Sequence, residues 1–85
     1  MEELIVTWSV FQTIADLYYD GHFTILKFTT NYRAAFGTKD TGCREMIEGM
    51  QSGTSLKLAL QEAVREFDQT HGTVYSDKFY NTLEY

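Results

Sequence analysis

The chain has 85 residues, no proline and 44% hydrophobic residues, a length that supports one hydrophobic core, so a single domain over residues 1–85 is expected. One cysteine excludes an internal disulfide, the acidic N-terminus is unlike a signal peptide, and no apolar run approaches the roughly 20 residues of a membrane helix, so a cytoplasmic protein without a membrane partner is predicted. The formal net charge of −5, with seven dispersed lysines and arginines, argues against direct nucleic-acid binding.

The first predicted element is a helix over residues 8–19 (WSVFQTIADLYY). Apolar residues recur there at helical spacing, Thr7 is placed to cap the first turn, and Asp20-Gly21 is typical of a helix end. A strand over residues 4–11 is the competing interpretation, because apolar residues also alternate there and β-branched residues are frequent. The helical set is Trp8, Phe11, Ile14, Ala15 and Tyr18, and the alternating set is Leu4, Val6, Trp8 and Val10.

Residues 22–30 (HFTILKFTT) are predicted to form a strand, because threonine and phenylalanine are dense in this segment. Asn31 can adopt the left-handed conformation of a tight turn, so residues 32–38 (YRAAFGT) are expected to return as the second strand of an antiparallel hairpin. A two-stranded hairpin alone is only marginally stable. Its edge is therefore expected to be completed by the C-terminal tail or by a second copy of the chain in a homodimer.

The middle of the chain is predicted to lead into a long amphipathic helix. Residues 43–50 are typical of a short helix or turn, and residues 51–55 (QSGTS) have the composition of a linker. The long helix then begins with Thr54 or Ser55 as its N-cap. Its apolar stripe consists of Leu56, Leu60, Ala63, Val64 and Phe67.

The tail, residues 71–85, holds too many aromatic side chains for a disordered segment. We expect it to pack back on the domain, either as a short helix capped by Ser76 or as a third strand through residues 73–75. The fold class predicted from these elements is α+β: an N-terminal helix, an antiparallel hairpin that the tail could extend, a short helix or turn, and the long helix.

The sequence indicates no catalytic residues, no metal site and no cofactor. His22, His71 and Cys43 are the candidate groups, and none has a partner at a spacing typical of a nucleophile, a general base or a set of metal ligands. Cys43 follows Gly42 and precedes Arg44, a setting that can activate a thiol, so a small thiol-dependent enzyme is kept as one alternative.

The thirteen aromatic residues exceed what a core of this size can bury fully. Tyrosine and arginine are enriched at protein interfaces, and the hairpin turn carries both. We therefore expect a non-enzymatic module that occludes a partner protein through its hairpin and its aromatic tail. The expected contact residues are Tyr19, Asn31, Tyr32, Arg33, Tyr75, Phe79 and Tyr80.

Two resemblances add to this interpretation. Residues 21–38 (GHFTILKFTTNYRAAFGT) followed by residues 53–64 (GTSLKLALQEAV) resemble small uncharacterised proteins of bacteria and their phages, a resemblance that implies no defined activity. With the binding role expected above, it fits a phage or mobile-element inhibitor or accessory factor. The Gly42-Cys43 pair and the Gly-Thr-Ser sequence before the long helix are similar to HicB-type antitoxins, although that family's proline-containing stretch is missing from this proline-free chain. This second resemblance implies an antitoxin-like regulator that neutralises a basic partner.

Overall fold

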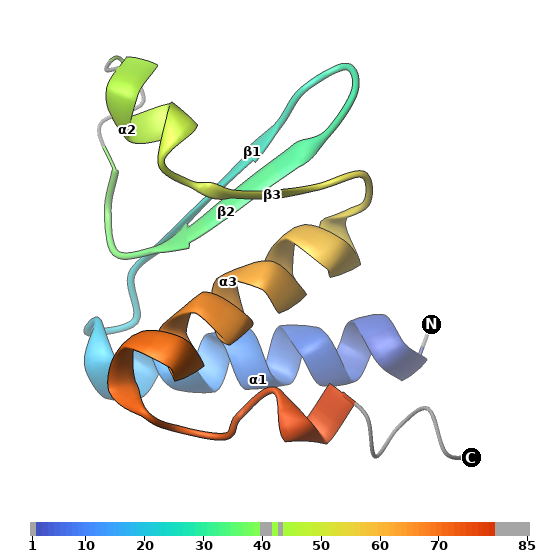
Figure 1. Cartoon of the computed structure of the whole chain (residues 1–85), viewed down its shortest axis with the longest axis vertical. Coiled ribbons are helices and arrows are strands. Elements are labelled where there is room, and N and C mark those ends of the chain that lie inside the picture. Colours follow the sequence, from blue (N-terminus) through green and yellow to red (C-terminus); the bar gives the residue numbers. More distant parts are fainter. Residues whose placement is uncertain (1, 40–41, 43, 80–85) are drawn as a thin grey trace.

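The computed structural model describes residues 2–39, 42 and 44–79 (Figure 1). Its elements in chain order are α1 (Glu2–Tyr18), β1 (Phe23–Lys27), β2 (Tyr32–Phe36), α2 (Arg44–Glu48), β3 (Gln51–Gly53) and α3 (Leu56–His71). The predicted α+β class is confirmed, with the N-terminal helix, the antiparallel hairpin and the long helix in the expected order.

The first helix begins at Glu2, earlier than expected, and the alternative strand over residues 4–11 is wrong. Thr7 does not cap this helix but lies fully buried within it. Its hydroxyl oxygen accepts a hydrogen bond from Gln61 Nε2 of α3 at 3.3 Å. Because this bond satisfies the hydroxyl group in the core, threonine is compatible with a helix interior at this position.

Two predicted helix boundaries are confirmed by their hydrogen bonds. Asp20 and Gly21 adopt positive φ angles of 58° and 81°, and the Gly21 N–H donates to the Ala15 carbonyl at 2.8 Å, a pattern that ends α1 and turns the chain into the hairpin. At the start of α3, Ser55 is the N-cap, and its hydroxyl oxygen accepts a hydrogen bond from the Leu58 N–H at 3.2 Å.

The three-stranded sheet has the order β1-β2-β3, and both pairs are antiparallel. Two expectations about its third strand were wrong: the tail supplies no strand at residues 73–75, and residues 51–53 of the expected linker form β3 instead. Gly53 allows β3 to pass very close to α3, because a Cβ atom there would lie 2.5 Å from the Ala59 nitrogen. The glycine that made this segment look like a linker is therefore what lets a strand fit beside the helix.

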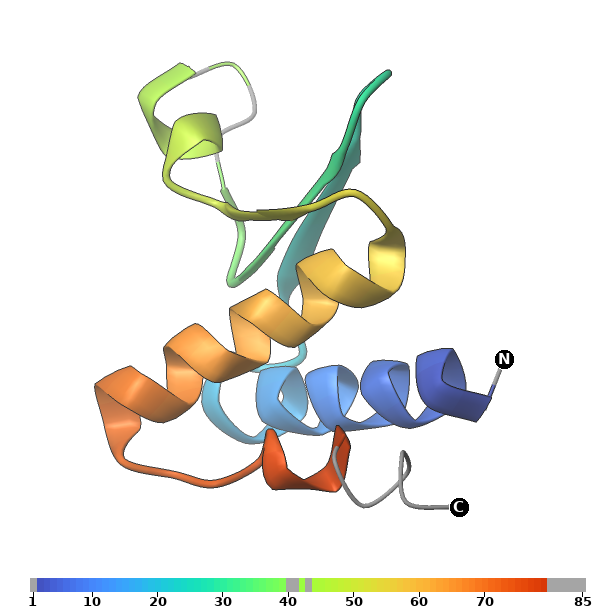
Figure 2. The same ribbon diagram turned by 45° about the vertical axis from the view of Figure 1, so that its right-hand side comes forward.

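The molecule has two layers, with α1 and α3 together on one face of the sheet (Figures 1 and 2). The short helix α2 was expected and lies on the other side of the strands (Figure 1). The apolar stripe predicted for α3 is confirmed, with Leu56 partly buried at its start. The core cluster consists of Val10, Phe11, Ile14, Ala15, Ala34, Phe36, Ala59, Leu60, Ala63, Val64, Phe67 and Phe79.

The tail packs back on the helices, as predicted, and the helical alternative is the one observed. Residues 77–79 form a short helical turn that lies beside α1 in both views (Figures 1 and 2). Phe79 is only 4% exposed and belongs to the core. The hairpin turn and the tail therefore lie at opposite ends of the molecule (Figure 1).

Candidate functional site

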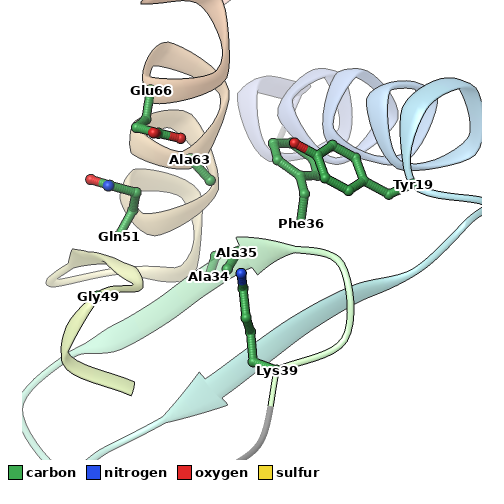
Figure 3. Close-up of a pocket in the computed structure, with 9 residues that line it drawn as sticks. All are labelled: Tyr19, Ala34, Ala35, Phe36, Lys39, Gly49, Gln51, Ala63 and Glu66. Carbon is green, nitrogen blue, oxygen red and sulfur yellow. The ribbon is translucent and has the colours of Figure 1, made fainter. Parts of the chain in front are cut away.

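A pocket of about 280 Å³ lies where β3 stops short of the end of β2 (Figure 3). The last pair between these strands is Ala34 with Gln51, so the final two residues of β2, Ala35 and Phe36, continue without a neighbouring strand on that side. Helix α3 forms another wall of the pocket, through Ala63 and Glu66. The lining residues are Tyr19, Ala34, Ala35, Phe36, Lys39, Gly49, Gln51, Ala63 and Glu66.

The main chain of β2 contributes polar groups to this pocket. The N–H of Gly37 donates to the carbonyl of His22, and the N–H of Phe28 donates to the carbonyl of Asn31, which fixes which pairs of the hairpin are hydrogen bonded. Because bonded and non-bonded pairs alternate in an antiparallel ladder, residues 33 and 35 direct their main-chain groups toward β1, whereas residues 32, 34 and 36 direct theirs toward β3. The N–H and C=O of Phe36 therefore face the pocket, two residues beyond Ala34, the last residue of β2 that pairs with β3.

Charged and polar side chains from separate parts of the chain surround this stretch of main chain. Lys39 extends toward β2 from the loop that follows it, and Gln51 and Glu66 lie across the pocket (Figure 3). The ion pairs among the described residues are Arg44 with Glu48 and Arg65 with Glu62, so Lys39 and Glu66 do not neutralise each other. The pocket thus holds one cation and one anion on different walls.

Tyr19 forms the remaining polar wall. Its ring stacks on Phe36 with 5.2 Å between centroids and an interplanar angle of 15°. Burial, and then the negative charge of Glu66, raise the pKa of the Tyr19 hydroxyl above its usual range. The hydroxyl is therefore protonated at neutral pH and can donate a hydrogen bond. Among the described residues of the predicted contact set, Tyr19 is the one that lines this pocket.

The predicted hairpin residues lie elsewhere. Asn31 and Arg33 line a separate hollow of about 400 Å³ between the hairpin turn and α2, which we call the tip surface; it is lined by Phe28, Thr30, Asn31, Arg33, Arg44, Ile47 and Glu48. Arg33 has a structural role there, because its Nη1 donates to the carbonyls of Ile47, Glu48 and Met50 at 3.1, 3.3 and 3.4 Å. Tyr32 faces the other way and packs against the core.

The described residues of the predicted tail set, Tyr75 and Phe79, line neither the pocket nor the tip surface. Tyr75 is partly buried, and its hydroxyl lies 3.2 Å from the hydroxyl of Tyr18, a contact that raises the pKa of Tyr75. Phe79 is a core residue, and Tyr80 lies outside the described residues. The structure therefore does not bring the hairpin and the tail together into one contact surface.

The pocket residues missed by sequence reasoning are Lys39, Gln51 and Glu66. Gln51 was assigned to a linker, Glu66 lies outside the apolar stripe predicted for the long helix, and no local pattern connects either of them with Lys39. The sequence does show two consecutive alanines, Ala34 and Ala35, in the predicted strand. Such small side chains leave space beside the main chain, but they do not identify which residues or ligands occupy it.

Of the candidate catalytic groups, the structure describes the two histidines, which lie in separate places. His22 Nδ1 lies 3.3 Å from the Thr38 hydroxyl oxygen, and His71 Nδ1 lies 3.1 Å from the Phe67 carbonyl oxygen at the end of α3. Cys43 lies outside the described residues. Within the described ranges, no three His, Cys, Asp or Glu side chains are grouped to hold a metal ion, and no helix is long and apolar enough to span a membrane.

Comparisons with protein-family models, with curated proteins and with solved structures gave no match to this chain. The assignment of a function therefore depends on the geometry of the pocket and of the open strand edges.

Proposed function

We propose that this protein is a binding module for another protein and that the pocket beside β2 takes the carboxyl-terminal residues of that partner. The observation that carries the proposal is that β3 pairs with β2 only as far as Ala34. The last two residues of β2, which lie near Lys39, therefore have no neighbouring strand on that side. An extended segment could continue the sheet at this place by exchanging hydrogen bonds with the Phe36 main chain. The sequence-based expectation was a module that occludes a partner protein through its hairpin and tail; this proposal keeps the protein partner and moves the contact to the pocket beside β2.

The charges give the segment a direction. A terminal carboxylate is attracted to the Lys39 ammonium group and repelled by the Glu66 carboxylate, so it would lie on the Lys39 side of the pocket. Glu66 and the Tyr19 hydroxyl can then interact with N–H groups or a basic side chain of the preceding residue. The small residues Ala34, Ala63 and Gly49 leave space for one side chain of the partner.

The test is a selection from a peptide library displayed with free C-termini, followed by affinity measurements on the selected peptides. Each peptide is synthesised twice, with a C-terminal carboxylate and with a C-terminal amide. We expect amidation to weaken binding by roughly tenfold or more, because a hydrogen bond to a charged group is lost. Peptides that bind equally well in both forms would overturn the proposal.

Protein variants locate the site. Lys39→Gln should reduce the affinity for the carboxylate form and leave that for the amide form nearly unchanged. Lys57→Gln, which removes the same charge from α3 outside the pocket, is the matched control and should bind like the wild type. Phe28→Ala tests the tip surface: if this change abolishes binding and Lys39→Gln does not, the pocket assignment is wrong.

A further inference from the structure

The first strand, β1, is an open edge of the sheet. It is the outer strand in the order β1-β2-β3, and the alternation established for the hairpin directs the main-chain groups of Phe23, Ile25 and Lys27 away from β2. Within the described residues no other strand pairs with it. The tail, which was one of the two expected ways of completing this edge, packs on the helices instead.

The usual features that protect a strand edge are scarce in β1. It contains no proline, its five residues pair one-for-one with β2 without a bulge, and its only charged residue, Lys27, stands at its end. Soluble proteins commonly block such edges with prolines, bulges or inward-pointing charges, because an open edge is a template for another strand. An edge of this kind is therefore expected to have a partner.

We propose that the partner of β1 is β1 of a second copy of this chain. The two strands pair antiparallel about a two-fold axis through Ile25 and make one continuous sheet with three strands from each copy. The proposal concerns the opposite edge of the sheet from the pocket beside β2. Dimerisation through β1 and chain-end binding in the pocket can therefore be tested independently of each other.

The sequence of β1 is complementary to itself in this register. Ile25 faces Ile25 of the partner subunit, Thr24 faces Leu26 of the partner subunit, and Phe23 faces Lys27 of the partner subunit. All the outward N–H and C=O groups of the strand are then used. Each lysine lies opposite an aromatic ring rather than the other lysine, so no like charges meet across the pair.

Registers centred on the neighbouring residues are worse. A two-fold axis at Thr24 or Leu26 passes through a non-bonded pair, because these residues direct their main-chain groups toward β2. Such a register also places one outward-facing residue, Lys27 or Phe23, opposite a residue outside β1. The register centred on Ile25 pairs all three outward-facing residues within the strand.

An apolar hollow of about 380 Å³ lies between the starts of α1 and α3 and is lined by Leu4, Ile5, Trp8 and Leu56. Trp8 connects it to the strand, because its ring contacts Phe23 edge-on with 5.4 Å between centroids. Ile5 is 65% exposed, an unusual exposure for an isoleucine beside other apolar side chains.

The first experiment measures mass by sedimentation equilibrium over a wide range of protein concentration. We expect the wild type to shift from the 9.8 kDa monomer toward twice that mass as concentration rises. Ile25→Pro removes the outward N–H without touching the hydrogen bonds to β2, a place where an edge strand accepts proline. This variant should stay monomeric with an unchanged far-UV circular dichroism spectrum.

Ile25→Ala is the matched control, because it shortens the same side chain but keeps the N–H, and it should still dimerise. A wild type that is monomeric at all concentrations would overturn the proposal. So would a folded Ile25→Pro variant that dimerises like the wild type.

Hydrogen exchange of the wild type tests the register without any substitution. The Ile25 amide should be protected at high concentration and exchange faster on dilution, whereas the Leu26 amide, bonded to β2, should stay protected at both. An Ile25 amide whose exchange does not depend on concentration would contradict the pairing even if the chain associates by another surface.

Discussion

Arg33 illustrates how one residue type can have two roles. An arginine next to a tyrosine at a hairpin turn is typical of a binding hot spot, and that interpretation followed from the sequence. In the structure its guanidinium group donates to three carbonyls at the end of α2 and the start of β3. Arginine near a helix C-terminus stabilises the last carbonyls and interacts favourably with the helix dipole.

We predict that Arg33→Ala lowers the free energy of unfolding by about 1–3 kcal/mol, because hydrogen bonds from a charged group are lost and partly buried carbonyls are left without them. Urea denaturation measures the change. Arg44→Ala is the control: its side chain is 90% exposed and pairs with Glu48 on the surface, so the expected change is below about 1 kcal/mol. Equal effects of the two substitutions would contradict the structural role of Arg33.

The residue-scale predictions that succeeded depended on local chemistry. Asp20-Gly21 ends a helix and Ser55 caps one because the required conformation and hydrogen bonds involve only neighbouring residues. The position of Arg33 relative to α2, and the placement of Lys39 and Glu66 on different walls of one pocket, depend on segments far apart in the sequence. No local pattern encodes such contacts, which is why the candidate pocket was not predicted.

At the scale of elements, the hairpin and α3 were predicted because each has a clear period of apolar residues. The strand β3 was missed because its three residues are too short to show a period and contain serine and glycine. It is held instead by β2 on one side and by the close approach of α3 on the other. Its existence is a tertiary effect that overrides local propensity.

Gly53 makes that approach possible, so we predict that Gly53→Ala destabilises the fold by about 1–3 kcal/mol through overpacking. A Cβ atom there would lie 2.5 Å from the Ala59 nitrogen and 2.8 Å from the Leu58 Cβ, so β3 and α3 would have to separate. Gly49→Ala is the matched control, since its Cβ would meet its nearest atom at an ordinary 3.6 Å. Thermal unfolding that is the same for both variants would argue against the close packing.

At the scale of the whole molecule, hydrogen bonds attach the C-terminal tail to the end of α3. Asp68 makes this attachment: its carboxylate accepts hydrogen bonds from the Thr73 hydroxyl at 2.6 Å, the Tyr75 N–H at 3.1 Å and the Ser76 N–H at 2.8 Å. One carboxylate thus orders the turn that places Phe79 in the core. Tyr75 and Phe79, which were expected to form an interface, pack against the core at this place.

This attachment should make the stability of the whole domain depend on acidic pH. Burial alone would raise the pKa of Asp68, but the hydrogen bonds from Ser76, Thr73 and the main chain outweigh it and hold the pKa below the ordinary value of 3.8. The unfolded chain therefore takes up the proton at a higher pH than the folded protein does. The contribution of Asp68 is complete above the ordinary pKa and is lost as pH falls through the lower pKa of the folded state.

We predict that Asp68→Asn lowers the free energy of unfolding near neutral pH by about 1–3 kcal/mol, since the amide accepts fewer of these hydrogen bonds. The difference from the wild type should shrink as pH is lowered below 3.8, because the wild type then loses the same interaction. Urea denaturation at a series of pH values measures it, with Asp77→Asn, an exposed carboxyl in the same tail, as the control. A difference that stays constant down to the lowest pH at which the protein folds would mean that the charge of Asp68 does not hold the tail in place.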